Sequence, residues 1–346
     1  WDWRFYAEQA RRARFELDEA EVKPYFSLDR MVAAMFDCAG RLFGLQFKAR
    51  PDIAGYHADV RAWDVLDADG SMRGLFLQDN FARPTKRSGA WMNALRQQSR
   101  ALGATPVILN NNNFARGAAG EPTLLSFDDV RTLFHEFGHG LHGLLSSVEH
   151  ERLAGTQVLR DFVELPSQLY EHWMAEPQVL KQFARHWQTD EPVPDALLAK
   201  LQAARQFGQG YETLRYTASA LVDMAAHALP AAPADVVAFE RDTLAKWQLP
   251  AEVGLNHRLT HFQHLFSSAG YAAGYYVYLW AEVLDCDAFD AFVEAGNVFD
   301  EAVAARLREC IYSAGNSREP GEAFRAFRGR DPVVEPMLKD RGLLPA

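Results

Sequence analysis

The sequence predicts a mainly α-helical fold with a small β-sheet, in the α+β class. Alternating apolar and polar residues with a turn signal occur within about 45–125, whereas helical patterns dominate about 126–346. Apolar residues make up 48% and charged residues 24% of the 346, which is typical of a protein with a sizeable core. No linker-like stretch separates the two regions, so we expect one domain over residues 1–346.

The first part of the chain predicts two helices and a β-hairpin. Residues 1–18 carry an aromatic face typical of a helix. A second helix is expected after Ser27, a good N-cap residue, and before Gly44, which can adopt the left-handed conformation of a helix end. Residues 60–67 and 73–78 alternate around an Asp-Gly pair, so we expect them to form a hairpin.

The middle of the chain predicts a short strand followed by a long helix. Residues 107–109 are expected to form the strand, which ends in a loop at the asparagine run 110–113. Ser126 is expected to cap a helix with two acidic residues in its first turn, where they suit the positive end of the helix dipole. From about residue 161 the pattern is helical, with 161–168 as the start of a helix.

The charge balance excludes some classes of partner. The chain has 36 Lys and Arg against 46 Asp and Glu, a net charge of −10. A nucleic-acid or anionic-membrane binder needs a basic surface, so we expect neither partner. No stretch of about 18 consecutive apolar residues predicts a transmembrane helix.

Cysteine use and the first residues bear on the compartment. The three cysteines contain no C-x-x-C pair, which excludes a disulfide framework or a thiolate zinc site and indicates a reducing compartment. We therefore expect a cytoplasmic protein, with the periplasm as the alternative. The first residues are not a signal peptide, but the chain begins without Met, so an upstream targeting segment stays open.

The most informative motif is H-E-F-G-H at residues 135–139. Residues i and i+4 of a helix lie about 6 Å apart along its axis, so His135 and His139 can reach one metal ion. Glu136 lies about 100° around the same helix, where a carboxylate can act as a base toward a metal-bound water. The alternative is a surface helix with two hydrogen-bonded histidines, but the apolar flanks favour a buried one.

A catalytic zinc site needs a third protein ligand and an open position. His142 lies about 10.5 Å along the axis from His135, too far to share an ion with it. A third histidine at the metzincin spacing would fall at Leu145, which excludes that class. The acidic candidates for the third ligand downstream of the motif are Glu149, Glu151, Glu164 and Glu171. Spacing alone favours Glu164 only modestly over Glu171 as this ligand.

Several stretches together resemble the thimet oligopeptidase family of zinc peptidases, and within it the peptidyl-dipeptidases. Members of this family are about twice as long, so the resemblance implies that the chain corresponds to their C-terminal, catalytic half and lacks the N-terminal half. The stretches are W-D-W-R-F-Y-A-E at 1–8, F-A-R-P at 81–84, K-R-S-G-A-W-M at 86–92, T-L-F-H-E-F-G-H-G-L-H at 132–142, D-F-V-E-L-P-S-Q at 161–168 and G-Y-A-A-G-Y-Y-V-Y-L-W at 270–280.

The resemblance implies a zincin-like helical metallopeptidase domain with one Zn²⁺ per chain. The family's zinc ligands fall on His135, His139 and Glu164, and its catalytic glutamate falls on Glu136. The implied reaction is hydrolysis by a zinc-activated water whose proton Glu136 accepts and later delivers to the leaving amine. Carboxylates that orient a ligand imidazole are common in such sites, and Asp161 and Glu171 are the candidates.

A tetrahedral intermediate also needs hydrogen-bond donors for its oxyanion. Phenols spaced by seven residues after glycines can supply them on a mobile loop. The family's loop tyrosines and histidine map best to Tyr271, Tyr275, Tyr278 and His264, with Tyr271, Tyr278 and His264 as catalytic candidates and Tyr275 as a substrate-binding one. Tyr276 is expected to pack in a core.

Release of dipeptides requires recognition of a free C-terminal carboxylate, for which Arg or Lys is suited. Arg83, with its neighbours Lys86 and Arg87, and Arg215 are the candidates, and a solvated basic patch is the alternative interpretation.

We therefore expect a zinc peptidase that acts on short or unfolded peptides and releases C-terminal dipeptides, as a monomer. The alternatives are an oligopeptidase that cleaves internal bonds, and a zinc-binding fragment that is inactive without its N-terminal half.

Overall fold

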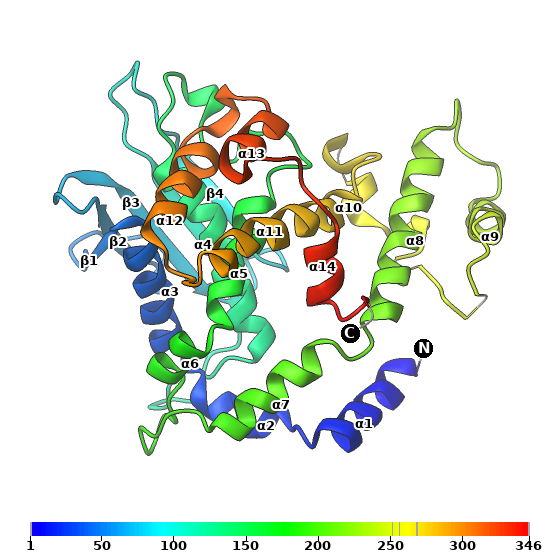
Figure 1. Ribbon diagram of the computed structural model, residues 1–346, viewed down its shortest axis with the longest axis horizontal. Coiled ribbons are helices and arrows are strands. Elements are labelled where there is room, and N and C mark those ends of the chain that lie inside the picture. Colours follow the sequence, from blue (N-terminus) through cyan, green and yellow to red (C-terminus); the bar gives the residue numbers. More distant parts are fainter. Residues whose placement is uncertain (1, 251, 256, 268, 345–346) are drawn as a thin grey trace.

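The computed structural model describes residues 2–250, 252–255, 257–267 and 269–344, which form a mainly helical fold around one mixed sheet (Figure 1). The predicted fold class is confirmed. The longer helices are α1 (Trp3–Phe15), α3 (Leu28–Phe43), α4 (Phe127–Leu145), α5 (Leu165–Met174), α7 (Asp195–Arg205), α8 (Gln209–His227), α9 (Val236–Lys246) and α11 (Val277–Glu294). The shorter helices are α2 (Glu19–Val22), α6 (Pro177–Phe183), α10 (Gln263–Phe266), α12 (Glu301–Leu307), α13 (Pro320–Arg328) and α14 (Glu335–Asp340).

The sheet has five strands in the order β1-β2-β3-β5-β4. Strands β3 and β5 are parallel, whereas the other neighbouring pairs are antiparallel. The strands are β1 (Gln46–Ala49), β2 (Arg61–Leu66), β3 (Met72–Phe81), β4 (Trp91–Arg96) and β5 (Val107–Phe114).

The elements predicted for the first part of the chain are present. Helix α3 begins after Ser27 and ends at Gly44, whose φ of 71° is the left-handed conformation that glycine adopts without strain. Strands β2 and β3 form the predicted antiparallel hairpin. Its turn includes Gly70 with φ 81°, and the Gly70 N–H donates to the carbonyl of Asp67.

The prediction of a loop at residues 110–113 is wrong, because this run lies inside β5. Strand β5 is an interior strand, with β3 on one side and the edge strand β4 on the other. Asn110, Asn111 and Asn112 are at most 4% exposed, and Asn112 Nδ2 donates to Asn80 Oδ1 at 2.9 Å. Backbone pairing on both sides and amide contacts between strands override the local turn preference of asparagine.

Four hydrophobic clusters occur among the described residues, and two of them bear on the candidate site. The main cluster joins the sheet to α3, α4, α5 and α11, and its aromatic centre packs Phe137 of α4 against Phe36 and Phe76 at centroid distances of 5.6 and 5.1 Å. The second cluster lies around α8 and consists of Val222, Leu259, Phe262, Leu265 and Tyr275. Figure 1 shows α8 and α9 at the far side of the molecule from the sheet.

No helix in the described ranges is both long and apolar enough to cross a membrane.

Candidate active site

Helix α4 presents the two motif histidines on one face. The helix begins at a capping box, in which the Ser126 hydroxyl accepts from the Asp129 N–H at 3.0 Å and the Asp129 carboxylate accepts from the Ser126 N–H at 2.9 Å. This cap fixes where the helix starts. One turn separates His135 from His139, and their ring centroids lie 5.0 Å apart.

Gly138 lets α5 approach α4 closely. A Cβ atom at Gly138 would lie 2.6 Å from the Pro166 carbonyl oxygen and from the Ser167 Cα. Only a residue without a side chain allows that contact. The approach brings the residue before α5, Glu164, toward the motif histidines. Glu164 lies at the N-cap of α5, in a turn, and the helix begins at Leu165, within the stretch 161–168 in which a helix start is predicted.

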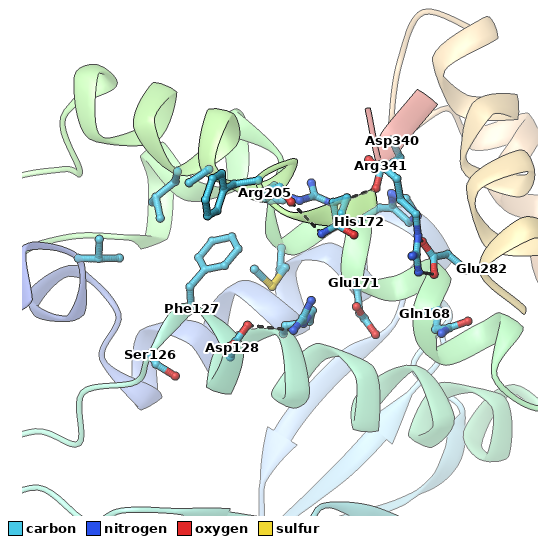
Figure 2. Close-up of a pocket in the computed structure, with 18 of the residues that line it drawn as sticks. Ser126, Phe127, Asp128, Gln168, Glu171, His172, Arg205, Glu282, Asp340 and Arg341 are labelled. Carbon is cyan, nitrogen blue, oxygen red and sulfur yellow. Dashed lines mark hydrogen bonds and ion pairs between the residues drawn. The ribbon is translucent and has the colours of Figure 1, made fainter. Parts of the chain in front are cut away.

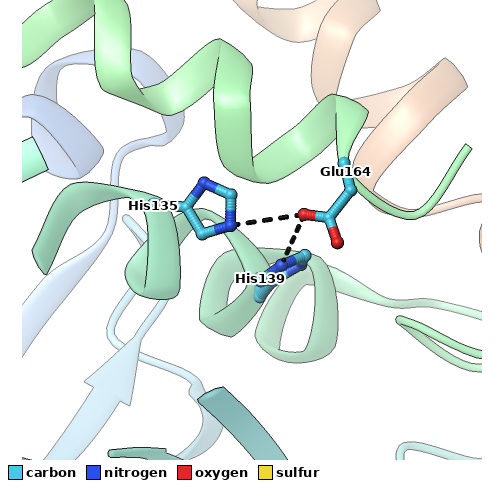
Figure 3. Close-up of side chains that lie close together, drawn as sticks. All are labelled: His135, His139 and Glu164. Carbon is cyan, nitrogen blue, oxygen red and sulfur yellow. Dashed lines mark ion pairs between the residues drawn. The ribbon is translucent and has the colours of Figure 1, made fainter. Parts of the chain in front are cut away.

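His135, His139 and Glu164 converge on one point (Figure 3). The Nε2 atoms of His135 and His139 lie 3.2 Å and 3.0 Å from Glu164 Oε2, respectively. The potential ligand atoms of the three residues all lie within 4.8 Å of one another. The Ser167 hydroxyl donates to Glu164 Oε2 at 2.9 Å and fixes this carboxylate. Two imidazoles and one carboxylate are a donor set that binds zinc and leaves a fourth position open.

The charges of these side chains also indicate a cation site. Although burial opposes the imidazolium, hydrogen bonds to Glu164 and Glu171 raise the pKa of His135 well above its usual value. Burial also opposes ionisation of Glu164, but the His139 charge and the imidazole hydrogen bonds hold the pKa of that carboxyl well below its usual value. Glu164 therefore stays ionised at neutral pH, and a divalent cation held by the three side chains would take the place of the imidazole protons as its positive partner.

The donor spacing fits a tetrahedral ion. Zinc bonds of about 2.0–2.2 Å place neighbouring ligand atoms about 3.4 Å apart. The two imidazole-to-carboxylate separations, 3.2 and 3.0 Å, are slightly shorter than this, and the three donors all lie within 4.8 Å of one another.

Of the two carboxylates considered for orienting an imidazole, the structure places Glu171 in contact with His135 and Asp161 elsewhere. Glu171 Oε1 lies 2.6 Å from His135 Nδ1, which fixes the ring and directs Nε2 toward Glu164. Asp161 instead accepts from the hydroxyl of Tyr276 at 3.0 Å. Because Asp161 precedes the helix, it does not share a face with Glu171.

Glu136 is a buried carboxyl next to the cluster, with 5% of its surface exposed. Its Oε2 has no hydrogen-bond partner among the residues that the structure describes. Burial raises its pKa, and the charges of His135 and His139 act in the opposite direction. A carboxylate that is desolvated and free on one oxygen is suited to accept a proton.

Tyr271 and Tyr278 lie together, with their hydroxyl oxygens 3.0 Å apart and their rings stacked. Burial, followed by the neighbouring Glu164 charge, raises the pKa of Tyr278, so this phenol stays protonated and near the cluster. Tyr275 is buried in the second cluster, and His264 lies 5.9 Å from the ring centroids of Tyr271 and Tyr275.

Tyr276 does not pack in a core as predicted. Its side chain is 38% exposed, and its hydroxyl donates to Asp161. Tyr276 immediately precedes α11 and lies outside the buried face that starts at Val277.

The two arginine candidates have partners of their own. Arg83 makes two hydrogen bonds to Asp79 at 2.6 and 2.8 Å, and Lys86 contacts the same carboxylate. The Arg215 guanidinium lies over the ring of Trp3 at 5.2 Å, in the contact between α1 and α8. Neither side chain belongs to the His135–His139–Glu164 group.

His142 is also separate from this group. It is fully buried, and burial lowers its pKa to about 3. Its ring faces Tyr312 edge-on at 6.2 Å, which agrees with the spacing argument against it as a ligand.

A cavity of about 770 Å³ lies beside α5 (Figure 2). Gln168, Glu171 and His172 line it from α5, and Arg205, Glu282 and Arg341 line it from other elements. Of the described zinc-ligand candidates, none lines this cavity. Glu171, which lines the cavity and contacts His135 Nδ1, therefore connects the cavity wall to the metal-ligand candidates.

His172, Asp285 and Cys286 form a second compact group of potential ligands at this cavity. His172 Nε2 already lies 2.7 Å from Asp285 Oδ1. Burial raises the pKa of Asp285 to about 7, and burial with nearby carboxylates raises that of the Cys286 thiol. A protonated thiol and a carboxylate bonded to histidine explain this group as a polar contact between α5 and α11.

Sequence reasoning missed Ser167, which holds Glu164, and Gln168, whose Nε2 donates to the Tyr278 carbonyl at 3.2 Å. Both follow Glu164 within the stretch 161–168 that carries the resemblance, and their closeness to Glu164 in the sequence is the feature that could have identified them.

The sequence profile described as "Peptidase family M3" matches residues 1–343. Dipeptidyl carboxypeptidase of Escherichia coli (strain K12) is 46% identical over 348 residues, which cover 99% of this chain and 51% of that protein. Oligopeptidase A of the same strain is 38% identical over 352 residues, with 99% and 51% covered. The chain spans about half the length of these relatives.

The BsuCP crystal structure has a TM-score of 0.52 to this chain at 13% identity, and covers 95% of this chain and 61% of that one. At this identity the likeness concerns the fold alone. The profile match and the curated relatives together settle the family: this chain belongs to peptidase family M3.

Proposed function

We propose that this chain is the catalytic part of a zinc-dependent peptidase that hydrolyses short or unfolded peptides. The observation that carries the proposal is the group of His135, His139 and Glu164, with potential ligand atoms within 4.8 Å, next to the buried carboxyl of Glu136. These three side chains would hold the ion, and Glu171 would fix the His135 ring.

Each of the surrounding residues has a distinct task in the proposed reaction. A zinc ion held by His135, His139 and Glu164 would supply Lewis acidity that activates a water and polarises the peptide carbonyl. The free Oε2 of Glu136 accepts the proton of the attacking water and delivers it to the amine that leaves. The hydroxyls of Tyr271 and Tyr278, 3.0 Å apart, donate hydrogen bonds to the oxygen that becomes negative.

We further propose that the products are C-terminal dipeptides. The higher identity to dipeptidyl carboxypeptidase than to oligopeptidase A, 46% against 38%, favours this mode. Cleavage of internal bonds, as the name of oligopeptidase A suggests for that protein, is the second candidate. A cation that recognises the free carboxylate is required only by the first mode. Arg83 and Arg215 remain the candidates for it.

The test combines zinc analysis with product mass spectrometry. The purified chain is incubated with an N-acetylated pentapeptide carrying a free C-terminus, and with the same peptide as a C-terminal amide. We expect one zinc per chain, release of only the C-terminal dipeptide from the free acid, and little cleavage of the amide. The Glu136→Gln chain is the control for contaminating peptidases.

The other outcomes are equally informative. Mixed fragments from both peptides would replace dipeptide release by internal cleavage. Zinc without products, followed by activity when the remaining part of a longer relative is added in trans, would mean that the chain binds the metal but needs that part for turnover. Absence of zinc would contradict the assignment of the ligands.

A further inference from the structure

The segment from Tyr271 to Tyr278, called here the tyrosine turn, is built on α8 and the second cluster. Tyr275 belongs to the second cluster, together with Val222 of α8. The ring of Tyr275 stacks on that of Tyr216 of α8 at 4.9 Å. The metal-ligand candidates belong to α4 and the N-cap of α5, which pack in the main cluster. The metal-ligand candidates thus rest on the main cluster. The tyrosine turn packs on the second cluster and joins the main one at its end, where α11 begins at Val277.

Asp223 of α8 is the polar link between α8 and the tyrosine turn. Its Oδ1 accepts from the Ala273 N–H at 3.1 Å, and its Oδ2 accepts from the Tyr275 N–H at 2.8 Å. The side chain is 1% exposed. A buried carboxylate that receives two backbone N–H groups on separate oxygens fixes both the position and the direction of the chain it holds.

Two further contacts complete this link. His227, one turn after Asp223, places Nδ1 2.7 Å from Asp223 Oδ1 and holds the carboxylate in place. The Tyr216 hydroxyl donates to the Tyr275 carbonyl oxygen. Helix α8 therefore contacts both the N–H and the carbonyl of Tyr275, and leaves this residue little freedom to rotate.

The turn needs such a link, because its backbone is strained. Ala273 has φ 55°, in the left-handed region that residues with a Cβ atom adopt only at an energetic cost. Its N–H is one of the two that Asp223 receives. Without this acceptor, the turn would lose a buried hydrogen bond and the contact that keeps Ala273 in this conformation.

The tyrosine turn ends at the metal-ligand candidates. Tyr278 contacts Tyr271 through their hydroxyls, and its carbonyl accepts from Gln168, one turn after Glu164. A change in the turn between Ala273 and Tyr275 would displace one phenol relative to the other, since the two tyrosines flank this segment.

We propose that Asp223 is a positioning residue of this peptidase: by holding the Ala273 and Tyr275 amides, it sets the phenols of Tyr271 and Tyr278 at the place where the substrate oxygen becomes negative. The inference rests on the proposed function for the role of the phenols, and on the hydrogen bonds alone for the position of the turn. Asp223 contacts none of the metal-ligand candidates, so it acts through the tyrosines.

The test compares Asp223→Asn with Glu240→Gln in the zinc-loaded chain. Glu240 is a matched control, because it is also a buried carboxylate near the second cluster, accepts the Leu259 N–H at 2.6 Å and pairs with Arg258, but does not contact the turn. In Asp223→Asn we expect faster hydrogen exchange in peptides that cover 271–278, unchanged zinc content, and kcat lower by about tenfold or more with little change in KM. Glu240→Gln should keep wild-type exchange in those peptides and wild-type kcat.

A double-mutant cycle separates positioning from general loss of structure. If Asp223 acts through the phenols, Asp223→Asn combined with Tyr271→Phe and Tyr278→Phe should be no slower than the phenol variant alone. Additive losses, an equal loss in Glu240→Gln, or unchanged exchange across the turn would each overturn the proposal. If the wild-type chain hydrolyses no peptide, either alone or with the remaining part of a longer relative added in trans, the proposed function fails by itself, and hydrogen exchange then decides the position of the turn.

Discussion

At the scale of single residues, the site contains two buried glutamates whose surroundings move their pKa values apart. Hydrogen bonds from two imidazoles keep Glu164 ionised, whereas burial raises the pKa of Glu136. The first arrangement suits a ligand for a cation, and the second suits a group that exchanges protons. This difference in environment, rather than residue type, separates the two roles.

Replacing Glu136 by Gln should abolish most of the activity but keep the metal. Glutamine has nearly the same shape but accepts no proton, and loss of a general base costs about 10²–10⁴-fold in kcat. The measurement is kcat together with zinc content, with the exposed Glu149→Gln as control. Normal hydrolysis by Glu136→Gln would assign the proton transfer to another group.

Replacing Glu171 by Gln should weaken zinc binding by about 10–100-fold, because Glu171 orients the His135 ring from 2.6 Å away. Competition with a chromophoric chelator measures the affinity. Asp161→Asn is the matched control. Asp161 contacts Tyr276 and no ligand imidazole, so this variant should keep the wild-type zinc affinity. Equal affinities of the Glu171 variant and wild type would remove Glu171 from the metal site.

At the scale of elements, the contact between α4 and α5 decides the position of the third ligand. Gly138 allows the helices to approach, and the Tyr312 hydroxyl donates to the Pro166 carbonyl at 2.8 Å and holds the start of α5. Glu164 is the N-cap residue of α5, so its position follows from that of the start of this helix. The geometry of the metal-ligand group therefore depends on a residue that has no side chain.

Gly138→Ala should lower the free energy of unfolding by about 1–3 kcal/mol and weaken zinc binding, because the added methyl group would lie 2.6 Å from α5 backbone atoms. Thermal unfolding and zinc titration measure both effects. Gly140→Ala gains the same helix propensity on the same helix, but its methyl group meets the side-chain amide of Asn110 at 3.3 Å. Zinc binding by Gly138→Ala that matches that of Gly140→Ala would contradict the argument.

Asp79 in strand β3 is the centre of an ion cluster that makes stability depend on pH. Burial opposes the charge of Asp79, but Arg83, Tyr56 and Lys86 outweigh it and lower its pKa from the usual 3.8 to about 2. Because the folded pKa is the lower one, the stabilisation is complete above about pH 4 and is lost as the pH falls toward 2.

Asp79→Asn should therefore lower the free energy of unfolding by about 2–4 kcal/mol at pH 6, since it leaves the largely buried Lys86 without its anion. The difference from wild type should shrink between pH 4 and pH 2. Urea unfolding at several pH values measures it, with the exposed Asp242→Asn as control. A difference that stays constant down to pH 2 would assign it to packing instead of charge.

At the scale of the whole molecule, the proposed site joins two hydrophobic clusters. The main cluster supports the metal-ligand candidates, and the second cluster supports the tyrosine turn. Smaller clusters open locally at lower free energy than large ones. Movement of α8 relative to α4 would act on the Tyr271–Tyr275 part of the tyrosine turn, whereas Tyr278 lies at the start of α11, which packs in the main cluster.

Val222→Ala should loosen the second cluster alone. Val222 is fully buried in α8, and removal of its methyl groups leaves a cavity that costs about 1–3 kcal/mol. Hydrogen exchange should become faster in α8 and the tyrosine turn, whereas α4 and α5 keep wild-type rates. Leu169→Ala, fully buried in the main cluster, should instead speed exchange in α4 and α5. Uniform acceleration in Val222→Ala would mean that the two clusters open as one.

The sequence by itself determined the features that depend on local spacing. The four-residue repeat placed His135 and His139 on one helical face, Ser126 and its acidic neighbours set the start of that helix, and the Asp-Gly pair set the hairpin. The α+β class followed from the change of period along the chain. Such features rest on contacts within a few residues, which the order of residues specifies directly.

Only the tertiary structure decided which distant groups meet. Spacing left Glu164 and Glu171 nearly equivalent, and the packing of α5 on Gly138 placed one at Nε2 and the other at Nδ1 of His135. The asparagine run became a strand because it has neighbours on both sides. Asp223 reached the tyrosine turn, 50 residues away, through the packing of α8. The physical reason is that burial and partners across the fold, rather than residue type, set these contacts.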